Sequence, residues 1–75
     1  MKYDGKISFT IDKNHPDYVD SYDGLTFTFE DTYKLNDDYT EEDAVAFIKR
    51  DLKLVAGGGY NTEHIHNVTF EIKRI

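Results

Sequence analysis

A strict alternation of apolar and polar side chains over residues 3 to 11 constrains the fold of this chain more than any other feature. This period of two predicts a β-strand with one face in a core and the other in water. Its apolar members are Tyr3, Ile7, Phe9 and Ile11. A second run alternates in the same way, with Leu25, Phe27, Phe29 and Tyr33 on its apolar side. Turn residues between positions 12 and 24 predict a hairpin with a long loop.

A helix is predicted to begin after Thr40, whose hydroxyl can accept a hydrogen bond from the third helical amide. Three acidic residues at positions 41 to 43 suit the positive end of the helix dipole. The expected apolar stripe consists of Ala44, Phe47, Ile48, Leu52 and Val55. The glycines at positions 57 to 59 are expected to end the helix and leave a mobile connector before Tyr60.

A third alternating run places Val68, Phe70 and Ile72 on one parity and predicts a last strand. The order is therefore ββαβ. A right-handed crossover gives a three-stranded antiparallel sheet of spatial order 2-1-3, with the helix packed on its apolar face. We expect one α+β domain over residues 1–75.

The two outer strands of such a sheet have free edges, and two interpretations of them stay open. Charged side chains at Glu30, Glu71 and Lys73 can blunt the edges, which is the general rule for natural sheets. Alternatively, one edge pairs with a second copy of the chain or with a strand of a partner.

Ten of the fifteen acidic residues fall between Asp17 and Asp43, where Lys34 is the one base, so this stretch has a net charge of −9. One interpretation is a solvated surface that keeps a small protein soluble. The other is a docking face for a basic protein, with tyrosine as anchor and charge as guide. The candidate partner-binding residues are Asp17, Tyr18, Asp20, Tyr22, Asp23, Asp31, Asp37, Asp38, Glu41 and Glu42.

An acidic docking face of this kind would bind the partner's surface that normally binds the phosphates of a nucleic acid. This mode of action is DNA mimicry. In size, absence of cysteine and uneven negative charge, the chain resembles phage-encoded inhibitors of host defence, including anti-CRISPR proteins and DNA mimics. The resemblance is one of composition. It implies stoichiometric inhibition of a nucleic-acid-binding enzyme. The alternative function is a structural or adaptor subunit that self-associates or pairs through a strand edge.

Other functions are not expected. The aspartates at 17, 20 and 23 step by three, unlike the ligands of a calcium-binding EF-hand loop. His64 and His66 share one side of a strand, in line with the core residues Val68, Phe70 and Ile72, and no third metal ligand is evident. We therefore expect rings that lie at the sheet rim or are partly buried, with hydrogen-bonded nitrogens, and no metal or cofactor.

Enzymatic activity is not expected either, since there is no cysteine nucleophile and a domain of this size rarely holds a ligand pocket. Direct nucleic-acid binding and membrane binding conflict with the negative field. The chain begins without the apolar segment of a signal peptide, and zero cysteine fits a reducing compartment. These features predict a cytoplasmic protein.

Overall fold

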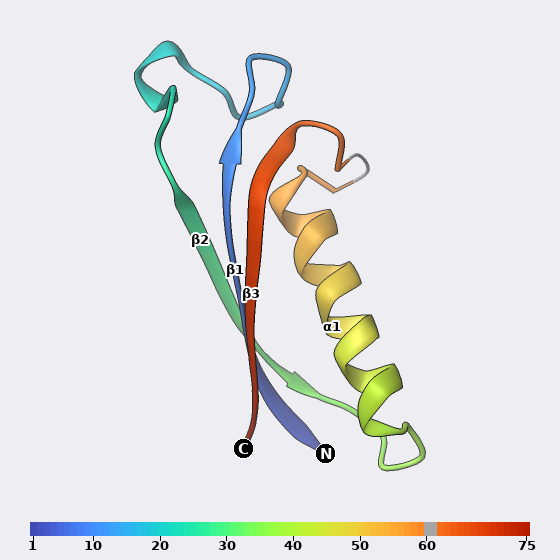
Figure 1. Ribbon diagram of the computed structural model, residues 1–75. Helices are drawn as coiled ribbons and strands as arrows, with labels where there is room; N and C mark the ends of the chain where they lie inside the picture. Colours follow the sequence, from blue (N-terminus) through green and yellow to red (C-terminus); the bar gives the residue numbers. More distant parts are fainter. Residues whose placement is uncertain (60–61) are drawn as a thin grey trace.

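The computed structural model describes residues 1–59 and 62–75. Within these ranges the order is β1 (Lys2–Ile11), a short 3-10 helix η1 (Asp20–Tyr22), β2 (Phe27–Lys34), α1 (Glu41–Ala56) and β3 (Ile65–Arg74) (Figure 1). β1 lies between β2 and β3 and is antiparallel to both. The predicted α+β fold with sheet order 2-1-3 is confirmed.

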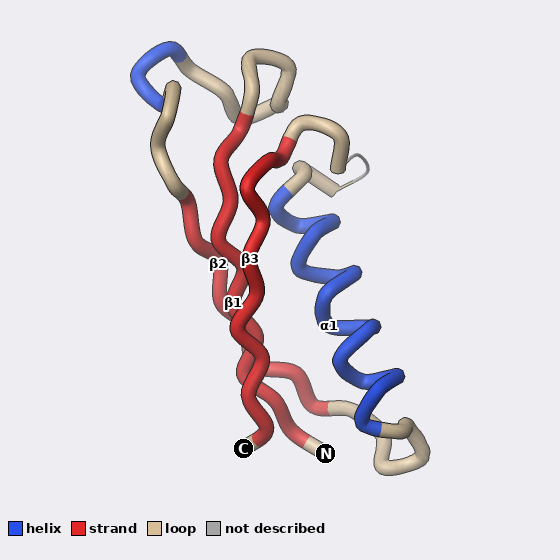
Figure 2. The backbone as a smooth tube through the Cα atoms, in the orientation of Figure 1, coloured by secondary structure: helices blue, strands red, loops and turns tan. Residues whose placement is uncertain are grey.

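The helix covers one face of the sheet, and the other face stays open (Figure 2). The long, narrow body measures 43 × 20 × 15 Å. The two chain ends lie close together at one end of the sheet (Figure 1). None of the helices in the described ranges is long and apolar enough to cross a membrane.

The core forms between α1 and the apolar side of β1. All four predicted residues of that side, Tyr3, Ile7, Phe9 and Ile11, are buried. Gly5 has the same parity, and a Cβ atom there would lie 2.8 Å from Cγ2 of Ile48 and 3.2 Å from Cδ1 of Leu52. The absence of a side chain at Gly5 therefore lets the helix approach the middle of β1 closely.

The helix begins as predicted, because Oγ1 of Thr40 accepts a hydrogen bond from the amide of Asp43 at 3.1 Å. Its buried residues recur every fourth position and are Ala44, Ile48, Leu52 and Ala56. Phe47 and Val55 were predicted to be in this stripe, but they are 43% and 45% exposed. A sheet of three strands covers one narrow row of the helix, so positions beside that row remain in contact with water.

Glycines end the helix, as predicted. Gly57 is the C-cap, and Gly58 and Gly59 adopt φ angles of +86° and +108°, which other residues rarely reach. A Cβ at Gly58 would lie 2.7 Å from Cγ of Pro16, so the β1–β2 loop rests against the helix end. The mobile connector was expected before Tyr60, and Tyr60 and Asn61 lie outside the described residues.

Leu25 was predicted to be part of the apolar side of β2, but it is 49% exposed. The strand begins two residues later, at Phe27, and the amide of Leu25 donates to the carbonyl of Tyr22 in a turn. Phe27 and Phe29 are half-buried, and Tyr33 is buried against the core. The alternation was correct, but the turn shortens the strand at its start.

A β-bulge changes the parity of β3. Ser8 pairs with Thr69, whereas Thr10 pairs with His66, and Asn67 has a φ of +54°. The extra residue on β3 puts Ile65 in the core, although its parity differs from that of Val68. His64 and His66 therefore lie on the open face of the sheet. The prediction that their rings align with the core residues of β3 is wrong.

Candidate partner-binding surface

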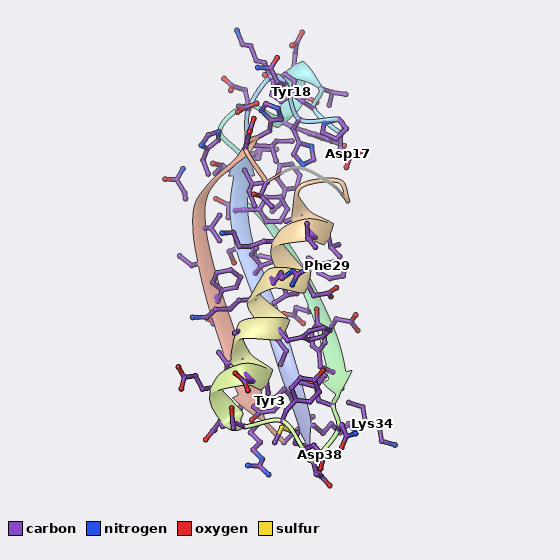
Figure 3. All side chains as sticks on the ribbon, turned by 90° about the vertical axis from the view of Figure 1, so that its right-hand side faces the viewer. Tyr3, Asp17, Tyr18, Phe29, Lys34 and Asp38 are labelled. Atoms are coloured by element: carbon purple, nitrogen blue, oxygen red, sulfur yellow. The ribbon has the colours of Figure 1, made fainter. Side chains whose placement is uncertain are left out.

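The ten acidic residues of the central stretch fall into three groups along the molecule. The loop group precedes β2, the strand group lies within β2, and the helix-start group surrounds the first turn of α1. In that order the members are Asp17, Asp20 and Asp23; Glu30 and Asp31; and Asp37, Asp38, Glu41, Glu42 and Asp43. All ten side chains are exposed. Asp17 and Asp38 lie at opposite ends of the long axis (Figure 3), so the stretch does not form one compact patch.

Backbone hydrogen bonds between residues three apart stabilise the loop group. The amide of Tyr22 donates to Val19 at 2.9 Å, and the amide of Asp23 donates to Asp20 at 3.3 Å. Burial, and then the nearby charges of Asp23 and Asp20, raise the pKa of Tyr18. The negative charge of the loop aspartates therefore acts on the Tyr18 hydroxyl.

Tyr22, the second predicted anchor, is 38% exposed. Its ring meets that of Phe27 edge to face at 5.2 Å between centroids. Beside it, Phe27, Phe29 and Val55 help to line a mainly apolar groove of about 210 Å³ between β2 and the C-terminal half of α1. Tyr22 therefore combines a fixed ring with accessible surface, as a contact residue requires.

The helix-start group includes one carboxylate that the chain itself neutralises. Asp37 forms an ion pair with the N-terminal amine of Met1, and that hydrogen bond and charge, with a smaller effect of Arg74, lower the pKa of Asp37. Asp38 is fixed through its amide, which donates to Oδ1 of Asn36 at 3.1 Å. Among the described residues, Asp38, Glu41 and Glu42 form no ion pair, so they carry the free charge at this end.

The strand group is divided between the two faces of β2. Glu30 lies on the open face, where Oε1 is 3.7 Å from Nζ of Lys6. Asp31 pairs with Gly5 in the sheet register and lies on the helix side, near Tyr33. The Tyr33 hydroxyl donates to Oδ2 of Asp51 at 2.6 Å, and burial together with this carboxylate raises the pKa of Tyr33.

A polar cluster on the open face was missed in the sequence. Asp12 accepts hydrogen bonds from both histidines, at 2.8 Å from Nε2 of His66 and 3.1 Å from Nδ1 of His64. The bond to His66 is the largest cause that lowers the pKa of Asp12, from 3.8 to about 2. The ring nitrogens are hydrogen-bonded at the sheet rim, as expected. Their partner is Asp12, because the bulge in β3 turns both rings to the open face.

In residues 1–59 and 62–75, no three His, Asp or Glu side chains are arranged to hold a metal ion. The Asp12 carboxylate instead joins the end of β1 to the start of β3. It holds the two strands together at the end of the sheet where the loop group lies.

Comparisons with protein families, with curated proteins and with solved structures find no match for this chain. The exposed charges and the tyrosine anchors are therefore the features of this chain that indicate a function.

Proposed function

We propose that this chain is an acidic protein-binding module that docks on a basic, nucleic-acid-binding surface and blocks it stoichiometrically. The proposal depends on the exposure of the ten carboxylates in the acidic stretch and on how few of them form ion pairs within the chain. All ten are exposed, and in the described part of the chain Glu30 and Asp37 are the two that form ion pairs. The rest of their charge is available to a partner.

The distribution of these charges favours an extended partner surface over a single basic pocket. The loop group and the helix-start group lie at opposite ends of a 43 Å body, with the strand group between them. A 43 Å length equals that of about a dozen base pairs of B-DNA, at roughly 3.4 Å each. A protein that binds a DNA duplex carries basic side chains, lysine and arginine, along a groove of this length. This correspondence supports mimicry of the phosphate backbone.

Backbone hydrogen bonds in the loop and helix-start groups also support the proposal. The loop group is held by backbone hydrogen bonds, and the helix-start group follows the Thr40 cap. Carboxylates on an ordered backbone lose less conformational entropy on binding than carboxylates on a disordered segment. Tyr18 and Tyr22 add apolar contact at the loop end, where a hot spot would combine aromatic anchoring with charge.

Capture from a bacterial lysate at low and at high salt tests the proposal. We expect the immobilised chain to retain nucleic-acid-binding proteins at low salt, to release them as salt rises, and to be displaced by double-stranded DNA. Asp38→Lys combined with Glu41→Lys, and Asp20→Lys combined with Asp23→Lys, should each weaken capture by about tenfold or more. These pairs leave the Asp37 contact with the N-terminus intact.

A matched control reverses charge away from the acidic stretch. Lys49→Glu combined with Lys53→Glu changes as many charges on the exposed side of α1 and should leave capture unchanged or slightly stronger. Capture that resists both salt and DNA would contradict docking by charge. It would favour the alternative, an adaptor that pairs through a strand edge and uses its charge for solubility.

A further inference from the structure

The outer strand β3 has a long free edge whose unpaired amides can be identified. The amide of Ile75 donates to the carbonyl of Lys2 at 2.9 Å, so this pair is a hydrogen-bonded one. Hydrogen-bonded pairs recur every second residue along an antiparallel ladder. In the register of β1 and β3, the amides and carbonyls of Phe70, Ile72 and Arg74 therefore point away from β1. They are free to pair with another strand.

Apolar surface accompanies these free backbone groups on the helix side of β3. Val68, Phe70 and Ile72 are half-buried, and together with Val45 and Lys49 of α1 they line an open hollow of about 550 Å³. Nζ of Lys49 lies 5.6 Å from the centre of the Phe70 ring. A strand added at this edge would cover the row and extend the core outward.

The charge on the open-face side of this edge is self-complementary. Glu71 and Lys73 are two residues apart on β3, and neither forms an ion pair among the described residues. An antiparallel copy centred on Ile72 places Glu71 opposite Lys73 of the second copy, twice by symmetry. If the twofold axis passed through Glu71, the Glu71 side chains of the two copies would face each other. If it passed through Phe70, Glu71 would face Thr69 of the second copy. The charges therefore select one register.

From this complementarity we propose that β3 pairs antiparallel with β3 of a second copy, about a twofold axis at Ile72, to form a six-stranded sheet. The paired segment runs from Thr69 to Ile75, an ordinary strand length. Ile72 meets its own symmetry mate on the helix side. The loop and strand groups of the acidic stretch lie before and within β2, across β1 from this edge.

The same register extends an alternation of charge that begins inside each monomer. Across the open face, Glu30 of β2 and Glu71 of β3 both lie opposite Lys6 of β1. In the dimer Glu71 then faces Lys73 of the second copy, which lies opposite Asp4 in its own sheet. The charges alternate in sign along this row, which runs through Glu30, Lys6 and Glu71 of one copy and then Lys73 and Asp4 of the second copy. This interface leaves the β2 side free and stands independently of the proposed docking function.

Sedimentation equilibrium of the full chain tests this dimer. The wild-type protein should move from the mass of one 8.7 kDa chain toward twice that mass as concentration rises. Glu71→Lys and Lys73→Glu should each raise the dissociation constant by about tenfold or more, because two attractive pairs become repulsive. An equal mixture of the two variants should associate again, since each lysine at 71 or 73 then meets a glutamate.

Rescue by mixing separates a lost interface from a lost fold. Glu30→Lys is the matched control, because it removes the other neighbour of Lys6 with the same change of charge and should leave the dimer unaffected. Should a reversed variant unfold, Glu71→Gln and Lys73→Gln should still weaken association several-fold. A wild-type chain that stays monomeric at millimolar concentration overturns the proposal, as does a mixture that fails to associate.

Discussion

His15 and Ala56 join the β1–β2 loop to the end of the helix, with Nε2 of the imidazole 2.7 Å from the carbonyl oxygen of Ala56. The other ring nitrogen, Nδ1, accepts a hydrogen bond from the amide of Asp17 at 3.0 Å. Since Nδ1 acts as an acceptor, Nε2 carries the proton and donates to Ala56. One buried neutral ring thus satisfies a helix-end carbonyl and positions the first aspartate of the loop group.

Replacing His15 should destabilise the protein. The side chain is 6% exposed, and His15→Ala leaves the Ala56 carbonyl and the Asp17 amide without their partners. We expect a loss of about 2 kcal/mol or more in the free energy of unfolding, measured with urea. Lys13→Ala, an exposed change in the same loop, should stay within about 0.5 kcal/mol of wild type. An equal effect of the two changes would contradict the assigned role of His15.

The close approach at Gly5 predicts a cost for even one methyl group. Gly5→Ala would place a Cβ 2.8 Å from Cγ2 of Ile48, a branched side chain that cannot swing away. The helix has to shift, and we expect a loss of about 1–3 kcal/mol in unfolding free energy. Ser8→Ala, on the open face of the same strand, is the control and should be nearly neutral. A stable Gly5→Ala variant would show that the helix packs less tightly on β1.

The Asp12 contact with the two histidines predicts a dependence on acid. Because the pKa of Asp12 is lowered from 3.8 to about 2, its charge stabilises the fold above pH 3.8, and this contribution disappears as pH falls toward 2. NMR titration of the Asp12 carboxyl should show a midpoint near 2 in the wild type. His66→Gln should move it upward, since His66 is the largest lowering cause. A wild-type midpoint near 3.8 would mean that the contacts are absent in solution.

Thermal unfolding checks the same contact independently. The difference in melting temperature between wild type and Asp12→Asn should shrink as pH falls through this range. A difference that stays constant would assign the effect of the substitution to something other than the charge of Asp12.

Local patterns in the sequence determined the elements and the sheet. Alternation in β1 and β3, the Thr40 cap and the glycines after α1 act over a few residues, so they could be read without the fold. The 2-1-3 order followed because a crossover through a helix has few geometries. The presence of the central charge was equally visible, since net charge needs no structure.

Tertiary structure alone decided how those elements meet and where the charge lies. The bulge at Asn67 turned His64 and His66 to the open face and brought them to Asp12, 52 and 54 residues away in the chain. The length of β2 separated the loop group from the helix-start group, and the narrow sheet left Phe47 exposed. Each of these features depends on contacts between residues far apart in sequence. The free energies of such contacts cannot be read from a pattern of neighbouring residues.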